Sequence, residues 1–555
     1  MAKETERKRC MEEEWRSILA SKQPSVPSRT DFPPRFIFGA ATSAYQVEGA
    51  WNEGGIIFDE SNGDIAADQY HRYKEDIDLI AKLGFGAYRF SISWSRIFPD
   101  GLGTKINEEG LTYYNNVINA LLERGIQPFV TLYHWDLPLN LEESMGGWLN
   151  EQVVKYFAIY AETCFASFGD RVKNWITINE PLQTAVNGYV TGIFAPGRCE
   201  HALEEPYLAS HHQLLAHAEA VSIYRNKYLE KATDIPPELV RAFANSQTSH
   251  FPIPSLFAHV PFSPHVSISW NYGKNTLLSS NRATKNFLLV DGCGVNTPQD
   301  IQKGQIGLVV DCEWAEALSD KIEDKKAAAR RLDFQLGWYL DPIFYGDYPE
   351  TMRERLGDRL PKFSEKNKEL LRNSVDFLGL NHYTTRFIAH STNTEDNYFY
   401  RTQEIERIAE WEDGEVIGEK AASPWLYVVP WGLRKLLNYV AQRYNNPPIY
   451  VAENGMDDED NQSCPLHEML DDKLRVRYYK EYLTAVAQAI KDGTDVRGYF
   501  AWSLLDNFEW KFGYTKRFGL IYVDYKNGLN RHLKSSAYWF LRFLKCGEDK
   551  NGKED

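Results

Sequence analysis

The sequence predicts an α/β protein built as a single (β/α)8 TIM barrel with elaborated βα loops. Two observations lead to this prediction: a short apolar run followed by a helical pattern recurs eight times, and these pairs share no repeated sequence. The first run, residues 36–45, precedes apolar residues spaced three and four apart within residues 64–84. A length of 555 residues alone would suggest several domains, but α/β barrels occur as long single units.

The other seven strands follow in chain order. They are expected within residues 87–94, 127–135, 172–181, 305–314, 375–383, 447–455 and 496–510. Helical patterns alternate with them in residues 111–125, 150–169, 207–231, 324–340, 431–444, 471–493 and 535–545. A doubly wound open sheet is the main rival, but no glycine-rich phosphate-binding loop follows the first strand.

Three segments do not follow this alternation of strand and helix patterns. Residues 1–30 are charged throughout and predict a mobile N-terminal extension before a barrel of residues 31–545. Residues 232–301 are rich in Ser, Asn and Pro without a sustained period, which predicts a disordered insertion in the barrel. Residues 546–555 form a polar tail.

Composition excludes several classes of function. The net charge of −15 argues against nucleic acid and anionic membranes as partners. The seven cysteines are odd in number and form no C-x-x-C pair, which indicates neither a disulfide framework nor a zinc site. The N-terminus has no apolar signal region and no run is long enough to span a membrane, so we expect a cytoplasmic protein.

Polar and aromatic side chains gather at the predicted strand ends, where TIM barrels place their chemistry. In chain order they are Gln46, His134, Asp136, Asn179, Glu180, Asn381, Tyr383, Glu453, Asn454, Trp502, Glu509 and Trp510. Each one alone is more simply a structural residue. Two glutamates with amide, imidazole and indole neighbours at one rim favour a functional site.

Two carboxyl groups at one rim suggest glycoside hydrolysis, in which one donates a proton and the other attacks or activates water. Pro181 biases Glu180 toward extended backbone, and Gly455 allows a sharp turn just beyond Glu453. Arg89 is expected to keep Glu453 ionised by Coulomb attraction. A structural ion pair under the barrel floor is an equally good interpretation of Arg89, and the two are compatible.

Six segments together resemble glycoside hydrolase family 1, most closely its plant β-glucosidases of the cytosolic type without a signal peptide. They are FIFGAATSAYQVEGAW (36–51), YHWDLP (133–138), TINEP (177–181), NHY (381–383), YVAENG (450–455) and WSLLDNFEW (502–510). The resemblance implies a retaining β-glucosidase with Glu180 as acid/base and Glu453 as nucleophile. It further implies sugar contacts from Gln46, His134, Asn179, Asn381, Tyr383, Trp502, Glu509, Trp510 and Phe518, and an aglycone-side contact from Trp425.

The expected partner is a small-molecule β-glucoside bound by a monomer or homodimer, with no cofactor and no metal. A catalytically impaired sugar-binding relative and a transglucosidase using the same residues remain as alternatives. The chain departs from the family pattern in a shortened loop near residues 55–61 and in the segment 232–301. The residues leave open the aglycone and the choice of glucose over galactose or fucose.

Overall fold

The computed structural model describes residues 27–49, 61–229, 304–392, 398–411, 414–461 and 463–545. Internal contacts divide the chain into two units, Met1–Ile223 with Gly304–Asp555, and Tyr224–Lys303. Of the second unit the described part is residues 224–229, which hold a π-helical turn, Tyr224–Tyr228. The predicted insertion 232–301, the tail 546–555, the extension up to residue 26 and the loop up to residue 60 lie outside the described residues.

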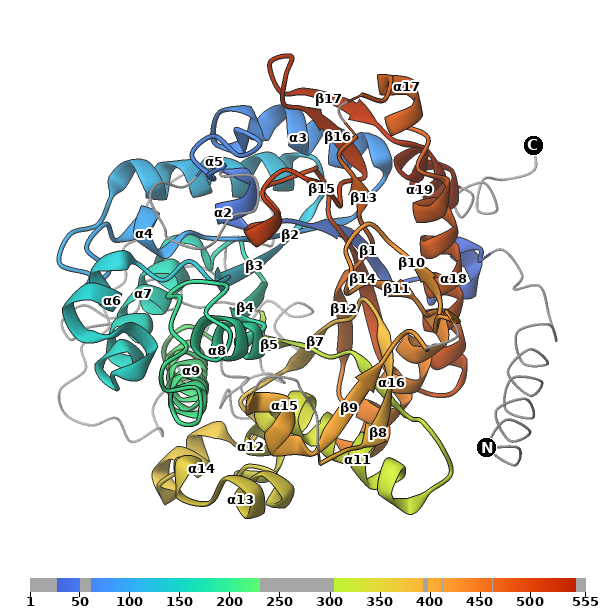
Figure 1. Cartoon of the computed structure of the whole chain (residues 1–555). Helices are drawn as coiled ribbons and strands as arrows, with labels where there is room; N and C mark the ends of the chain where they lie inside the picture. The colour runs from blue at the N-terminus through green and yellow to red at the C-terminus, as the bar shows by residue number, and fades with distance from the viewer. Residues whose placement is uncertain are drawn as a thin grey trace, which may run out of the picture. The chain divides into compact units, whose positions relative to one another are not determined.

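Eight parallel strands of the first unit close into a barrel, which confirms the predicted fold class (Figure 1). The strands are β1 (Ile37–Ala41), β2 (Ala87–Ser91), β3 (Gln127–Tyr133), β4 (Asn174–Asn179), β5 (Gln305–Asp311), β7 (Phe377–Asn381), β12 (Ile449–Asn454) and β14 (Val496–Trp502). Their order around the barrel is β1-β14-β12-β7-β5-β4-β3-β2. All eight predicted runs are therefore barrel strands in sequence order, and every carboxyl end opens on the same rim.

Helices surround the ring of strands (Figure 1). The main ones are α3 (Gln69–Leu83), α5 (Glu108–Glu123), α7 (Gln152–Phe168), α8 (Pro181–Tyr189), α9 (Glu205–Ile223), α11 (Ile322–Leu332), α12 (Trp338–Tyr345), α16 (Pro430–Arg443), α18 (Lys473–Lys491) and α19 (Ser535–Lys545). The helix predicted over residues 324–340 is divided, because a π-helical turn, Asp333–Gly337, separates α11 from α12. Smaller sheets join β6 (Trp314–Ala317), β8 (Thr385–His390) and β9 (Ile405–Ile408), and pair β16 (Ile521–Asp524) with β17 (Asn530–Leu533).

The remaining elements are short. They are the helices α2 (Ala44–Val47), α4 (Trp94–Ile97), α6 (Leu139–Met145), α13 (Glu350–Leu356), α14 (Glu365–Leu371), α15 (Tyr398–Gln403) and α17 (Leu466–Met469), and the strands β10 (Glu419–Lys420), β11 (Tyr427–Val428), β13 (Asp458–Glu459) and β15 (Lys516–Arg517). Single 3-10 turns lie at Arg29–Asp31, Gly147–Leu149, Gly357–Arg359 and Trp510–Phe512.

Aromatic rings from opposite walls fill the lower barrel interior. Phe129 of β3 contacts Tyr450 of β12 at 5.3 Å and Phe500 of β14 at 4.9 Å between ring centroids. Phe377 of β7 meets Tyr450 at 5.1 Å. Because these strands are not all neighbours in the sheet, the rings pack across the barrel axis. The interior below the rim is thus a packed core, as expected for this fold.

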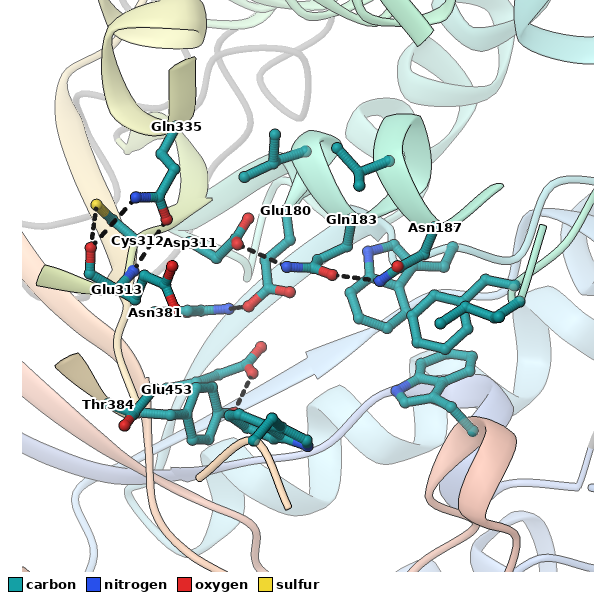
Figure 2. A pocket seen from close by; sticks show the side chains of 18 of the residues that line it. Glu180, Gln183, Asn187, Asp311, Cys312, Glu313, Gln335, Asn381, Thr384 and Glu453 are labelled. Carbon is teal, nitrogen blue, oxygen red and sulfur yellow. Dashed lines mark hydrogen bonds between the residues drawn. The ribbon is translucent and has the colours of Figure 1, made fainter. Parts of the chain in front are cut away.

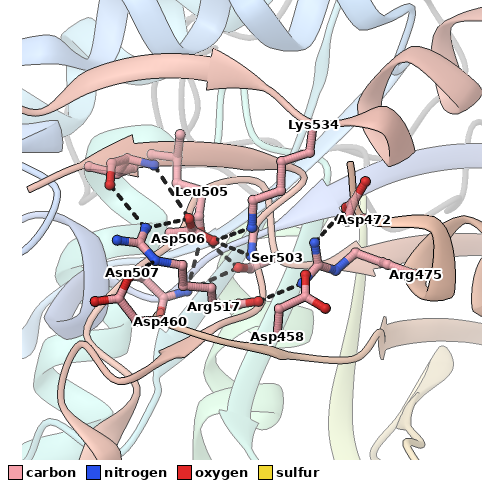
Figure 3. Close-up of polar contacts among 12 residues, drawn as sticks. Asp458, Asp460, Asp472, Arg475, Ser503, Leu505, Asp506, Asn507, Arg517 and Lys534 are labelled. Carbon is pink, nitrogen blue, oxygen red and sulfur yellow. Dashed lines mark hydrogen bonds and ion pairs between the residues drawn. The ribbon is translucent and has the colours of Figure 1, made fainter. Parts of the chain in front are cut away.

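A buried ion cluster holds the loop that follows β14 (Figure 3). Asp506 accepts hydrogen bonds from Lys534 at 2.8 Å and from Arg517 at 2.7 Å, and the backbone N–H of Gly519 donates to it at 2.9 Å. Burial would raise the pKa of Asp506, but Lys534 and Arg517 lower it below its usual value. The cluster continues to Arg475, which pairs with Asp458 at 2.6 Å. The loop toward Glu509 is therefore fixed by compensated charges.

Replacing Asp506 by Asn should destabilise the protein, because buried Lys534 would lose its carboxylate partner and buried Arg517 would keep only Asp460. The expected loss is about 3–5 kcal/mol, measured as a lower midpoint of urea unfolding. Asp495→Asn is the matched control, since Asp495 pairs with Arg497 at an exposed site where about 1 kcal/mol or less is expected. Equal midpoints for the two variants would contradict this account of the cluster.

Candidate active site

A cavity of about 410 Å³ opens at the carboxyl ends of the barrel strands (Figure 2). Ten of the residues predicted for the site line it: His134, Glu180, Asn381, Tyr383, Trp425, Glu453, Trp502, Glu509, Trp510 and Phe518. Three others, Gln46, Arg89 and Asn179, are buried and hydrogen-bonded to these lining residues. The fold thus brings these thirteen residues to one place, whereas Asp136 and Asn454, which also end predicted strands, are buried outside the pocket lining.

Glu180 lies at the turn between β4 and α8. Its backbone is left-handed, with φ of 44°, so the prediction of extended backbone there is wrong. The Glu180 N–H donates to the carbonyl of Val309 on β5 at 2.9 Å, and Pro181 starts the helix at the next residue. The chain passes from strand to helix across this one residue, and that tertiary constraint outweighs the local bias of Pro181.

The surroundings of the Glu180 carboxyl favour its protonated form. The side chain points into the pocket, where the Asn381 amide donates to Oε1 at 2.6 Å. Burial raises the pKa of Glu180 well above its usual range, and the negative charges of Asp311 and Glu453 raise it further. The Asn381 hydrogen bond and Arg89 oppose this shift without reversing it.

Glu453, near the end of β12, has a different set of partners. Arg89 donates to its Oε1 at 2.6 Å and the Tyr383 hydroxyl donates to its Oε2 at 2.7 Å. The glutamate is buried at 3% exposure and the arginine at 1%. Arg89 and Glu453 therefore form an ion pair, a charge-assisted hydrogen bond away from water that is compatible with both interpretations of Arg89.

Gly455 is required for a different reason from the predicted one. Its φ does not lie in the left-handed region, so no unusual turn demands glycine. A Cβ atom at this position would lie 1.9 Å from the carbonyl oxygen of Trp502. Close approach of β14 to the segment after Glu453 therefore excludes a side chain.

Asn179 joins the two carboxyl groups through a buried network. Its Oδ1 accepts from Arg89 at 2.6 Å and from Asn381 at 3.1 Å. Its amide nitrogen lies 3.1 Å from Nε2 of His134. Burial and the nearby Arg89 charge lower the pKa of His134 well below its usual range, so the imidazole is neutral.

Aromatic rings and one carboxyl group form a second side of the pocket. The Gln46 amide donates to Glu509 at 3.3 Å and to Asn507 at 3.1 Å. His134 and Trp502 stack with centroids 5.9 Å apart. Trp425 is 36% exposed and lies 5.7 Å from the Tyr383 ring, toward the solvent side of the pocket. This side offers hydroxyl partners and flat apolar surfaces together, which suits a sugar ring.

Several lining residues were missed by the sequence analysis, among them Trp135, Gln183 and Asp311. Asp311 could have been found, because it is the polar residue that ends the apolar strand GLVVD. Trp135 follows His134 directly and adopts a left-handed φ of 71°, which the local sequence does not predict. Among the described residues, no group of three His, Cys, Asp or Glu side chains could hold a metal ion. None of the described helices is long and apolar enough to cross a membrane.

Comparison with known proteins gives a consistent result. The sequence matches glycosyl hydrolase family 1 over residues 28–252 and 257–549, a range that includes most of the segment 232–301. Beta-glucosidase 42 of Arabidopsis thaliana is 58% identical over 555 residues, 97% of this chain and 99% of the relative.

Solved structures agree with the sequence match. A crystal structure of a rice β-glucosidase is 43% identical with a TM-score of 0.78, over 93% of this chain and 99% of that one. A mutant of the same rice enzyme in a covalent complex with Glc is 43% identical with a TM-score of 0.77, over the same shares of 93% and 99%. The chain therefore belongs to glycosyl hydrolase family 1.

Proposed function

We propose that this protein is a retaining β-glucosidase that hydrolyses the O-glycosidic bond of small β-D-glucosides by double displacement. The observation that carries the proposal is the contrast between two carboxyl groups in one pocket. Glu180 is surrounded by groups that favour its proton, whereas Glu453 accepts hydrogen bonds from Arg89 and Tyr383. Pairs of carboxyls set apart by their environments are the usual acid/base arrangement of glycosidases.

In this proposal Glu180 donates its proton to the glycosidic oxygen while the carboxylate of Glu453 attacks the anomeric carbon. The leaving alcohol departs and a glycosyl ester on Glu453 remains. Glu180, now ionised, takes a proton from water as that water attacks the ester, which releases the sugar and restores both carboxyls. Arg89 positions Glu453, and a rice family member in a covalent complex with Glc supports an intermediate of this kind.

The remaining pocket residues would hold the sugar. Gln46, His134 and Glu509 supply donors and acceptors for hydroxyl groups, and Asn179 is assigned to the 2-hydroxyl, whose hydrogen bond strengthens in the transition state. Trp502 or Trp510 would stack on the ring. Asn381, Tyr383 and Phe518 complete this part, and Trp425 is assigned to the aglycone.

We further propose the cytosolic type of the plant enzymes and a cytoplasmic location. The four described cysteines, Cys164, Cys199, Cys312 and Cys464, are free thiols, which supports a reducing compartment. A monomer or homodimer is proposed as the assembly. Cell fractionation and sedimentation of the purified protein test these two proposals.

A retaining mechanism predicts that β-glucose is the first sugar released from an aryl β-glucoside, because two successive inversions restore the starting configuration. Proton NMR in the first minutes of hydrolysis measures this before mutarotation mixes the anomers. Release of α-glucose first would indicate a single displacement and refute the mechanism. A protein that binds the glucoside without hydrolysing it would support the impaired sugar-binding alternative.

Glu453→Ala should abolish hydrolysis of an aryl β-glucoside, because no carboxylate remains to form the ester. Azide added to this variant should restore turnover and give the α-glycosyl azide, since the small anion occupies the vacated space and attacks once. Mass spectrometry and NMR identify that product. Normal activity in the variant would show that Glu453 is not the nucleophile.

Glu180→Gln should lower kcat/KM by about 10²–10⁴-fold for a glucoside whose leaving group needs a proton. The same variant should keep most of this first step with a 2,4-dinitrophenyl glucoside, whose leaving group departs unprotonated. Rapid-mixing kinetics measure the release of each phenol. A loss of equal size for both substrates would point to a binding role for Glu180 in place of proton donation.

A further inference from the structure

Asp311 stands beside Glu180 at the rim of the barrel (Figure 2). It ends β5, the strand between β4 and β7. The strand registers pair Asn179 with Val309 and Asp311 with Asn381. Asp311 therefore lies between Glu180, directly after β4, and Asn381, which donates to Glu180. The order of strands β4, β5 and β7 sets this neighbourhood.

Helix α8 holds the Asp311 carboxyl in place. The Gln183 amide donates to its Oδ2 at 2.7 Å, and Asn187 donates to Gln183 Oε1 at 2.6 Å. This helix begins immediately after Glu180, so one rigid element positions both carboxyls. The other oxygen of Asp311, Oδ1, is buried and has no hydrogen-bond partner among the described residues. The Asp311 carboxyl is therefore held through Oδ2, while Oδ1 stays without a hydrogen-bond partner among the described residues.

We propose that Asp311 is a positioning residue for Glu180: its negative charge, fixed by Gln183, holds the proton on Glu180 until the glycosidic oxygen takes it. The inference rests on the proposed function. In the first step the proton leaves Glu180 for the leaving oxygen and the Glu453 carboxylate bonds to the anomeric carbon. Asp311 forms and breaks no bond and keeps its own charge throughout.

The charges facing Glu180 from each neighbouring strand support this role. After burial, Asp311 raises the pKa of Glu180 the most, ahead of Glu453, while Asn381 and Arg89 lower it. Burial raises the pKa of Asp311 itself to about 6, with Gln183 and Arg331 opposing and Glu313 adding to the shift. Asp311 is therefore mostly ionised at pH 7 and above, where the proton on Glu180 would otherwise be lost.

Asp311 also differs from Glu453 in whether its negative charge persists during the reaction. The charge of Glu453 disappears when the glycosyl ester forms, whereas the charge of Asp311 persists. Its effect on Glu180 is thus present in both steps: it keeps Glu180 protonated before the first step, and it favours the return of a proton from water to Glu180 in the second.

The test is the pH profile of Asp311→Asn with an aryl β-glucoside whose leaving group needs a proton. The variant keeps an acceptor oxygen for Gln183 but loses the charge, so the alkaline limb of kcat/KM should move to lower pH by about one unit. Above that limb, kcat/KM should be about tenfold lower than in the wild type. An unchanged limb, or a limb at higher pH, would overturn the inference and leave Asp311 as a structural acceptor.

Two further variants keep the test decisive. Gln183→Leu removes the donor that lowers the pKa of Asp311, so Asp311 should carry less charge and the limb should shift in the same direction by less; a shift to higher pH would count against the proposal. Asp76→Asn is the control. Asp76 is another buried carboxyl, on α3, that accepts hydrogen bonds from Arg531 and does not line the pocket. Its limb should stay in place, and a shift equal to that of Asp311→Asn would overturn the inference.

The wild-type profile separates the two proposals. Wild-type protein that hydrolyses no β-glucoside would refute the proposed function. An active wild type with an unmoved limb in Asp311→Asn would refute only the role of Asp311.

Discussion

The buried guanidinium of Arg89 is the interaction on which the site depends. Removing an arginine from water costs several kcal/mol unless carboxylate and amide oxygens replace the lost hydration. Arg89 meets this need with Glu453 and Asn179, both at 2.6 Å. These two hydrogen bonds compensate the burial of the guanidinium. They also link the end of β4 to the end of β12 across the barrel. Asn179 then extends the network to Asn381 and His134.

The two glutamates of the pocket are similarly buried but differently partnered. Glu453 receives two strong donors, whereas Glu180 receives one amide and faces the carboxyls of Asp311 and Glu453. Burial disfavours the ionised form of Glu180, and its single amide donor does not reverse that effect against two nearby carboxyls. The chemistry proposed for the pocket follows from this asymmetry. The neutral imidazole of His134 adds a hydrogen-bonding group without adding charge.

The buried carboxylate of Asp506 lies outside the pocket and, unlike the carboxyl of Glu180, is paired with cations. Around Asp506, nearby cations and a backbone N–H compensate the buried carboxylate (Figure 3). This cluster holds the loop that leads from Trp502 to Glu509. The lining of the pocket leaves some oxygens, such as Oδ1 of Asp311, without protein partners among the described residues.

The sequence by itself determined the barrel and most of the pocket. Eight apolar runs of strand length, each followed by helical spacing, are enough to specify parallel strands with covering helices, because only that arrangement buries both faces of the sheet. Polar residues at the ends of those runs must then meet at one rim. For this reason the sequence alone predicts Glu180, Glu453 and their neighbours at one rim.

Tertiary structure alone decided the finer geometry. The left-handed backbone at Glu180 comes from a strand-to-helix turn tied to β5, and Gly455 is required by the carbonyl of Trp502, a residue distant in sequence. Asp311 was visible as a strand end, yet its relation to Glu180 depends on β5 lying between β4 and β7. Such effects arise from contacts between strands, and local patterns of residues carry no information about which strands become neighbours.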